Sequence, residues 1–436
     1  MSWQLLLGLP QTKTRLPIII STAYLWIVDT IALHRGTWSI GSGTKLGINL
    51  WPGLEVEEAI FFLVTNTMVV FGLCAFDNAI AIIDAFPSLF PSVSTLPSPK
   101  ELVEALLVPK SAYDSARLDG LRNAHSILSR KSRSFCLASG VFSRRLRIDL
   151  VILYAFCRIA DDLVDQAGNA KNATIWIDHL SHFLKTTYST RRTENQYQAA
   201  LAPFSPEARS VLVLLPTDRL PQQPLHALLD GFRSDVKFMN DAKTPKSSPP
   251  TPIRTEGDLE MYASRVAATV AELCLRLVYF HDPAGSGEDG TVDDRCLAAG
   301  KRMGIALQYI NIVRDVATDA ADGRCYIPAD WFRDPAPTSV LEFQAELMAH
   351  RKRILDMAFE LYAQNRNAIE RLPEYARDGI RVAVEGYMEI GRVMREKMAK
   401  GQKLDMAGGG KEGRASVPRI RRLWAGWRAM SGPGTV

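Results

Sequence analysis

Two long apolar stretches lie near the start of the chain. Residues 16–33 are apolar except for Asp29 and a few small polar residues, and residues 59–76 carry no charge. At a rise of 1.5 Å per residue, a helix of either length crosses most of a hydrocarbon core about 30 Å thick. We therefore predict two transmembrane helices, with a third, shorter span at residues 78–90 that Asp84 interrupts. A pair of buried core helices is the alternative, because neither run much exceeds the minimum length of a span.

The charges beside the first stretch indicate its orientation. Lys13 and Arg15 precede it, and basic residues favour the cytoplasmic side of a membrane helix. Two spans return the chain to the side on which it began. We therefore expect a multi-pass membrane protein whose larger, soluble part lies on the cytoplasmic side.

Beyond this region the pattern changes to that of an all-α protein. Prolines and serines around residues 87–99 interrupt any helix, so we predict a linker at residues 91–112 between a membrane region (1–90) and a helical domain (113–436). Apolar residues then recur at steps of three and four, as in amphipathic helices. The clearest segments are residues 115–130, 149–165, 255–280, 294–321 and 340–371. Two stretches, 203–224 and 243–252, are predicted to be loops.

Composition narrows the class of protein further. The 436 residues are 47% hydrophobic and carry a formal net charge of +5, which excludes a disordered chain. The basic residues are not densely clustered, so no nucleic-acid partner is expected. The six cysteines are scattered without zinc-binding spacing, which indicates reduced thiols in a reducing compartment.

One predicted helix places acidic side chains on a single stripe. Arg158, Asp161, Asp162 and Asp165 follow one another at steps of three and four, directly after the apolar run at residues 150–156. Carboxylates on a buried stripe lose hydration and repel one another unless a cation lies among them. The alternative is a solvated face with an Arg158–Asp162 ion pair.

A second predicted helix repeats this arrangement. Gln308, Asn311, Asp315 and Asp319 share one face, again after an apolar run. The helix is expected to end near Gly323, so that Arg324 projects from a turn just beyond the acidic face. An EF-hand is excluded, because the alternating ligands and the glutamate at its twelfth position are absent.

Together the two acidic helices indicate a metal-assisted reaction on a phosphate ester. Each offers an aspartate pair at i and i+4 with an arginine beside it. Carboxylates in small number suit Mg²⁺, which takes phosphate oxygens and water as its remaining ligands. Arginine binds the same phosphates, and cation and arginine together make diphosphate a good leaving group.

The soluble part resembles the squalene/phytoene synthases, which have the all-α isoprenoid-synthase fold. The resemblance runs from about Arg117 to the C-terminus. It rests on residues 132–135, 154–165, 262, 266–270 and 307–328, in this order. The family usually has glycine where Ala268 and Ala271 stand, and the added methyl groups are expected to narrow the prenyl channel slightly.

The resemblance implies roles for individual residues. It implies a Mg²⁺ site, with Mn²⁺ as a substitute, in which the aspartates hold the cation against two substrate diphosphates. The implied metal ligands, which are also catalytic, are Asp161, Asp165, Asp315 and Asp319. The implied diphosphate-binding arginines are Arg133, Arg158, Arg314 and Arg324. The implied polar residues of the cavity are Tyr154, a further catalytic residue, and Gln308, Asn311 and Tyr326.

The implied reaction joins two molecules of geranylgeranyl diphosphate head to head to give phytoene, a carotenoid precursor. Two other functions stay open on the sequence. One is a squalene-type synthase that acts on farnesyl diphosphate with a reductant. The other is a non-catalytic membrane scaffold that binds prenyl diphosphates.

The N-terminal part resembles a different family, the carotenoid-type membrane lycopene cyclases, which in fungi are fused in front of a phytoene synthase. The matching residues are 32–38, 54–62 and 65–66. The resemblance implies lycopene as a second substrate, with Glu57 and Glu58 as proton donors; the alternative is that they mark the membrane interface. The family motif has proline where Glu55 stands, and the fused enzymes carry two such repeats. Only one is present here, resembling the second, so we expect residues 1–90 to form a partial cyclase region.

The segment at residues 416–428 mixes arginine with tryptophan. Such a composition is typical of a helix that lies on an anionic membrane surface, and a packed terminal helix fits it equally well.

Overall fold

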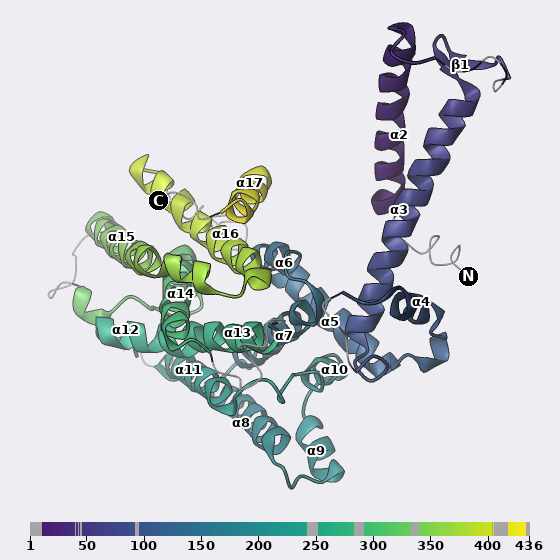
Figure 1. Ribbon diagram of the computed structural model, residues 1–436. Helices are drawn as coiled ribbons and strands as arrows, with labels where there is room; N and C mark the ends of the chain where they lie inside the picture. The colour runs from purple at the N-terminus through teal and green to yellow at the C-terminus, as the bar shows by residue number, and fades with distance from the viewer. Residues whose placement is uncertain are drawn as a thin grey trace. The chain divides into compact units, whose positions relative to one another are not determined.

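The computed structural model describes residues 11–39, 41, 43, 46–91, 96–241, 252–282, 292–332, 340–402, 404 and 417–432. The chain forms two compact units, Met1–Tyr113 and Asp114–Val436. Each unit is described separately below, and Figure 1 shows their elements.

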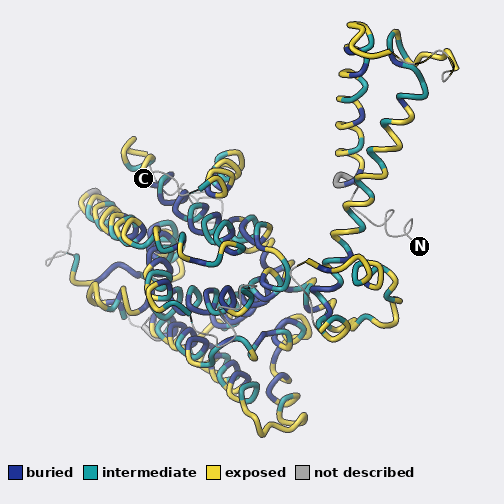
Figure 2. Tube along the Cα trace, viewed as in Figure 1, coloured by how far each residue is buried: buried dark blue, intermediate teal, exposed yellow. Residues whose placement is uncertain are grey.

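The first unit is built on a hairpin of two long helices, α2 (Gln11–His34) and α3 (Val56–Ala85), which pack against each other. A small antiparallel pair of strands, β1 (Asn49–Trp51) and β2 (Leu54–Glu55), lies in the connection between them. Thr14–His34 and Val56–Ala85 are long and apolar enough to cross a membrane. Most of their residues face outward, as the teal and yellow colouring of Figure 2 shows.

The predicted third span is wrong as a separate helix. Residues 78–85 instead continue α3, which ends where the amide of Phe86 donates to the carbonyl of Ile82. Asp84 does not interrupt the helix but lies in its last turn, with its side chain buried. The break comes at Phe86, directly before Pro87, a residue that disfavours the helical conformation in its predecessor.

The segment that we predicted to be a linker contains a short helix, α4 (Pro99–Leu107), followed by the 3₁₀ turn η2 (Lys110–Ala112). Ser98 and Glu101 form a capping box at its start, and Pro99 occupies the first turn, where a missing N–H costs nothing. Ala105 packs against Ala79 and Ile83 of α3. The domain boundaries at residues 90 and 113 stay a prediction.

The second unit is helical, and its described residues contain no strand. Its elements are α5 (Ser115–Lys131), α6 (Arg133–Ser139), α7 (Arg144–Asp165), α8 (Ala170–Tyr188), α9 (Glu194–Leu201), α10 (Pro206–Leu212), α11 (Gln222–Asp241), α12 (Glu256–Ala263), the π-helical turn η3 (Ser264–Ala268), α13 (Thr269–Phe280), α14 (Asp294–Ala321), the 3₁₀ turn η4 (Ala329–Trp331), α15 (Val340–Asn365), the 3₁₀ turn η5 (Arg366–Arg371), α16 (Glu374–Ala399) and α17 (Arg419–Met430). The all-α fold class is confirmed, and the five predicted helical segments are helical.

One predicted loop is wrong. Residues 203–224 contain α10 and the start of α11, because Ser205 caps a helix that Pro206 can begin. The other predicted loop, residues 243–252, lies outside the described residues except for its last position.

The core of this unit consists of two clusters. One joins α5, α7, α8 and α11 around fully buried aromatic side chains such as Phe156 and Phe183. The other joins α14, α15 and α16 around residues such as Tyr309 and Met388. The dark blue segments in Figure 2 follow these helices.

A glycine sets the distance between α14 and η3. A Cβ atom at Gly304 would lie 2.8 Å from the carbonyl oxygen of Ala267 and 3.0 Å from the Cα of Ala268. The two backbones therefore approach so closely that no side chain fits between them.

We expect Gly304→Ala to destabilise the second unit by about 1–3 kcal/mol, the usual cost of overpacking, even though alanine favours a helix. The measurement is the melting temperature of the full chain in detergent. Gly257→Ala in α12 is the matched control, because its Cβ would meet only the Thr255 hydroxyl at 3.6 Å. An equal or higher melting temperature for Gly304→Ala would contradict the close approach.

Candidate active site

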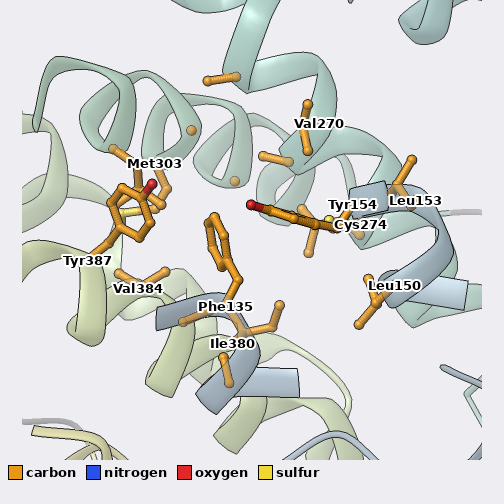
Figure 3. Close-up of a pocket in the computed structure, with 18 of the residues that line it drawn as sticks. Phe135, Leu150, Leu153, Tyr154, Val270, Cys274, Met303, Ile380, Val384 and Tyr387 are labelled. Atoms are coloured by element: carbon orange, nitrogen blue, oxygen red, sulfur yellow. The ribbon is translucent and has the colours of Figure 1, made fainter. Parts of the chain in front are cut away.

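A cavity of about 320 Å³ lies inside the second unit. Its walls come from α6, α7, η3, α13, α14 and α16, and most of its lining is apolar, as Figure 3 shows. Three residues predicted from the sequence line it, Tyr154, Gln308 and Asn311. Ala271 also lines it, at a position where the family usually has glycine, whereas Ala268 is buried in the core.

Three aromatic rings meet in this cavity. Phe135 stacks on Tyr387 with ring centres 4.9 Å apart and meets Tyr154 edge-on at 5.8 Å. Burial raises the pKa of Tyr154, so its phenol stays protonated at physiological pH. Tyr387 of α16 was not predicted from the sequence, because it stands in none of the motifs.

The predicted acidic motifs lie one turn beyond the cavity on both helices. On α7 the lining residue Cys157 is followed four positions later by Asp161. On α14 the lining residue Asn311 is followed four positions later by Asp315. Residues at i and i+4 share a helix face, so both motifs continue the lined faces towards the carboxyl ends of their helices.

Ion pairs organise the first motif. Arg158 donates to Asp161 at 2.7 Å and to Asp162 at 2.6 Å. Lys131, at the end of α5, makes a second ion pair with Asp162 at 2.9 Å. Lys131 was not predicted, because nothing in the local sequence links it to a residue 31 positions away.

The second motif has the same character. Both oxygens of Asp315 accept from the neighbouring Arg314, at 2.9 and 2.6 Å. The Asn311 amide nitrogen donates to Gln308 at 3.2 Å. The amide oxygen of Asn311 is buried and accepts no hydrogen bond from any described residue.

Arg324 connects the two motifs. Gly323, with φ of +73°, ends the turn after α14, and the Arg324 amide donates to the carbonyl of Asp319 at 2.7 Å. The Arg324 guanidinium then reaches Asp165 on α7 at 2.8 Å. The turn predicted from the sequence therefore joins the ends of both acidic helices.

Asp235 on α11 is a buried carboxylate that the sequence reasoning missed. It accepts a hydrogen bond of 2.7 Å from Tyr326, whose ring stacks on Tyr262 at 4.8 Å. Burial raises the pKa of Asp235 to about 6, although the tyrosine hydroxyls and Arg324 act in the opposite direction. Asp235 therefore anchors the loop that carries Arg324 and Tyr326.

Arg133 lies apart from the ion pairs of the two acidic motifs. It is exposed at the first position of α6 and forms no ion pair with a described residue. The aspartates of the two acidic motifs pair with Arg158, Arg314 and Arg324 instead.

The donor atoms suit a divalent cation that takes few ligands from the protein. Among the described residues, no three acidic, histidine or cysteine side chains converge into a complete metal site. Burial and the carboxylate of Asp165 nevertheless raise the pKa of Asp161 to about 7 against the effect of Arg158, so negative charge is unfavourable there without a cation. The unsatisfied amide oxygen of Asn311 adds a neutral oxygen one turn before Asp315. Hard oxygen donors of this kind fit a divalent ion that also binds phosphate.

The first unit contains a second cluster of polar residues, where α2 ends and α3 begins. Glu57 accepts a hydrogen bond from the amide of Leu46. The carboxyl of Glu58 hydrogen-bonds to that of Asp29, which also accepts from the Trp38 indole at 3.1 Å. Asp29 is only 3% exposed. It was not singled out as a site residue from the sequence, since it stands alone within an apolar run.

Comparisons with known proteins agree with the all-helical fold of the second unit. The family model described as squalene/phytoene synthase matches residues 128–421. A solved dehydrosqualene synthase in complex with a ligand superposes on 72% of this chain and 96% of its own, with a TM-score of 0.53 and 24% identity, and shares its fold.

Curated relatives extend the match to the first unit. The chain is 47% identical to bifunctional lycopene cyclase/phytoene synthases of Phaeosphaeria nodorum and Gibberella fujikuroi, over 99% of its length and 71% and 72% of theirs. It is 44% identical to the Neurospora crassa protein of the same name, over 98% of its length and 72% of that protein. The chain therefore belongs to the squalene/phytoene synthase family, within the group of bifunctional lycopene cyclase/phytoene synthases. Both resemblances seen in the sequence are confirmed.

The pKa of Asp161 leads to a test of the site without any ligand. The folded value of about 7 lies above the ordinary value of 3.8, so the folded chain binds a proton that the unfolded chain has released. This contribution to stability is complete below the ordinary pKa and is lost as pH rises through about 7. In a chelator we expect the melting temperature to fall less between acidic and alkaline pH in Asp161→Asn than in the parent chain.

Asp178→Asn on α8 is the control for this comparison, because Asp178 is an exposed partner of Arg233. It should leave the pH dependence unchanged. Parallel melting curves for the parent chain and Asp161→Asn would show that Asp161 has no raised pKa.

Proposed function

We propose that the second unit joins two molecules of geranylgeranyl diphosphate head to head to form phytoene. The observation that supports this most directly is the end of the apolar cavity, where two helices each continue into an aspartate motif with an arginine partner. The names of the curated relatives point to the same reaction.

In this proposal the charged residues bind and orient the diphosphates. Asp161, Asp165, Asp315 and Asp319 would hold Mg²⁺, or Mn²⁺ in its place. The bound cation supplies charge neutralisation for the departing diphosphate. Arg158, Arg314 and Arg324 already neutralise aspartates at this end of the cavity, and their planar guanidinium groups bind phosphate oxygens equally well. Arg133 and Tyr326 complete the proposed binding set.

The cavity itself protects the reaction. Allylic cations need surroundings that exclude water and add no nucleophile. The faces of Phe135 and Tyr387 stabilise positive charge, and the protonated phenol of Tyr154 orients the reacting chain without acting as a nucleophile. Gln308 and Asn311 supply the polar contacts between this apolar lining and the charged end.

We further propose that the first unit lies in the membrane and acts on the ends of lycopene. Cyclisation begins with protonation of a terminal double bond and ends with the loss of a proton from the new ring. Glu57 and Glu58 are the proposed proton donors, and the contact of Glu58 with buried Asp29 supports an acid group at this place. The chain would be multi-pass, with the synthase unit on the cytoplasmic side.

We expect Asp161→Asn or Asp315→Asn to lower phytoene formation at least about 100-fold, because each removes charge that the leaving diphosphate requires. The assay supplies labelled geranylgeranyl diphosphate with Mg²⁺ to the full chain in detergent and separates the hydrocarbons. Asp356→Asn on α15 is the matched control, since this aspartate pairs with Lys352 and Arg395 on the surface. Near-normal activity of both site variants, with circular dichroism unchanged, would refute the proposed metal site.

The same assay separates the other two functions. A squalene-type synthase would convert farnesyl diphosphate with NADPH and leave geranylgeranyl diphosphate unused. A scaffold would bind prenyl diphosphate with Mg²⁺ and release no diphosphate. Either result would replace the proposal for the second unit.

For the first unit we expect Glu58→Gln to abolish the formation of cyclised carotenoid from lycopene and to leave phytoene formation unchanged, because the amide cannot donate a carboxylic proton. The measurement is product analysis in membranes that contain lycopene and the full chain. Glu104→Gln on α4, an exposed partner of Lys100, is the control. Cyclisation that persists in Glu58→Gln, or that is absent from the parent chain, would contradict the proposed cyclase role.

A further inference from the structure

The helix α17 presents a stripe of large apolar side chains to the outside of the second unit. Ile420, Leu423, Trp424 and Trp427 are each more than half exposed, and they recur at steps of three and four. The rings of Trp424 and Trp427 stack on each other at 4.8 Å. Water disfavours such a surface, so a partner that accepts both apolar and indole groups is expected to cover it.

Basic residues border this stripe. The helix contains arginines at 419, 421, 422 and 428 and no acidic residue. Arg421 is used within the unit, in ion pairs with Glu389 and Glu396 of α16. Arg419 and Arg428 are exposed and form no ion pair with a described residue. The outer surface of α17 is therefore both apolar and positively charged.

The opposite side of α17 fixes the helix against the wall of the cavity. Ala429 packs with Ala138 of α6 and Val382 of α16. Gly426 is buried on the same side, where a Cβ atom would be in ordinary contact with Leu137 of α6 at 3.4 Å. Ala138 also lines the cavity, so this one small side chain contacts both the cavity and α17.

We propose that this outer surface of α17 docks on an anionic lipid bilayer, with the indoles at the level of the headgroups. Such surfaces bind exposed tryptophan and leucine beside arginines like Arg419 and Arg428, which form no ion pair with a described residue. A second copy of the chain fits less well, because a symmetric contact would bring the same arginines together. The inference rests on the proposed membrane location of the chain and extends it to a separate part of the sequence.

The test is tryptophan quenching in lipid nanodiscs that contain the full chain. The acyl chains of the lipids are brominated, and the discs are prepared with and without phosphatidylserine. The chain has eight tryptophans, and bromine quenches only those that contact the acyl chains. In anionic discs, the double variant Trp424→Phe, Trp427→Phe is therefore expected to show less quenching than the parent chain, because the two removed indoles are quenched ones. Trp176→Phe is the control. Trp176 of α8 packs on Phe204 inside the second unit, so this variant should lose only emission that bromine does not quench.

The arginine variant gives a second measurement. Arg419→Gln with Arg428→Gln should reduce the quenching of Trp424 and Trp427 in anionic discs and have little effect in neutral ones. If brominated lipid quenches neither Trp424 nor Trp427, in anionic or in neutral discs, the proposal is overturned. Protection of the indoles in cross-linked dimers would also overturn it. Quenching of Trp26, which lies in α2, reports separately whether the proposed spans are inserted. Phytoene assays in the same discs report the proposed reaction.

Discussion

Carboxylates beside an apolar cavity are the constraint on which this structure depends. Removing an aspartate from water is costly unless positive charge or hydrogen bonds replace its hydration. The second unit meets that cost with side chains from three places, namely Arg158 within α7, Arg314 within α14 and Arg324 in the turn after α14. Each arginine lies next to an aspartate in sequence or space. The arrangement keeps the acidic ends folded and leaves guanidinium groups at the site where a diphosphate would bind.

The sequence was sufficient to predict most of the helices and the place where the second acidic helix ends. The bounds of α14 agree with the predicted segment, because its apolar steps are continuous and Gly323 ends it. The hairpin of apolar helices also follows from composition alone. The linker and loop predictions gave too little weight to helix caps, because Pro99 and Pro206 stand in the first turns of the capped helices α4 and α10. Asp84 lies within α3 with its side chain buried.

The parts of the site that the sequence did not reveal come from distant segments. Lys131, Asp235 and Tyr387 meet the motifs only after α5, α11 and α16 have packed, and none stands at a diagnostic spacing. The same is true of Asp29, which lies 29 positions before Glu58 and reaches it only through the hairpin of α2 and α3. Sequence spacing reports neighbours on one helix, whereas a cavity is made by neighbours on several.

The salt bridge between Arg324 and Asp165 has a consequence for how the chain folds. It joins positions 159 residues apart, and the loop that it closes contains most of the helices of the second unit. Closing so long a loop costs entropy that local helix contacts cannot repay early, and contacts of large sequence separation form slowly. The two acidic helices therefore meet late in folding. During synthesis, the first motif leaves the ribosome well before the second, and until Arg324 has been added to the chain Asp165 lacks this partner. The end of the site where the two acidic helices meet is thus among the last parts of the enzyme to become native.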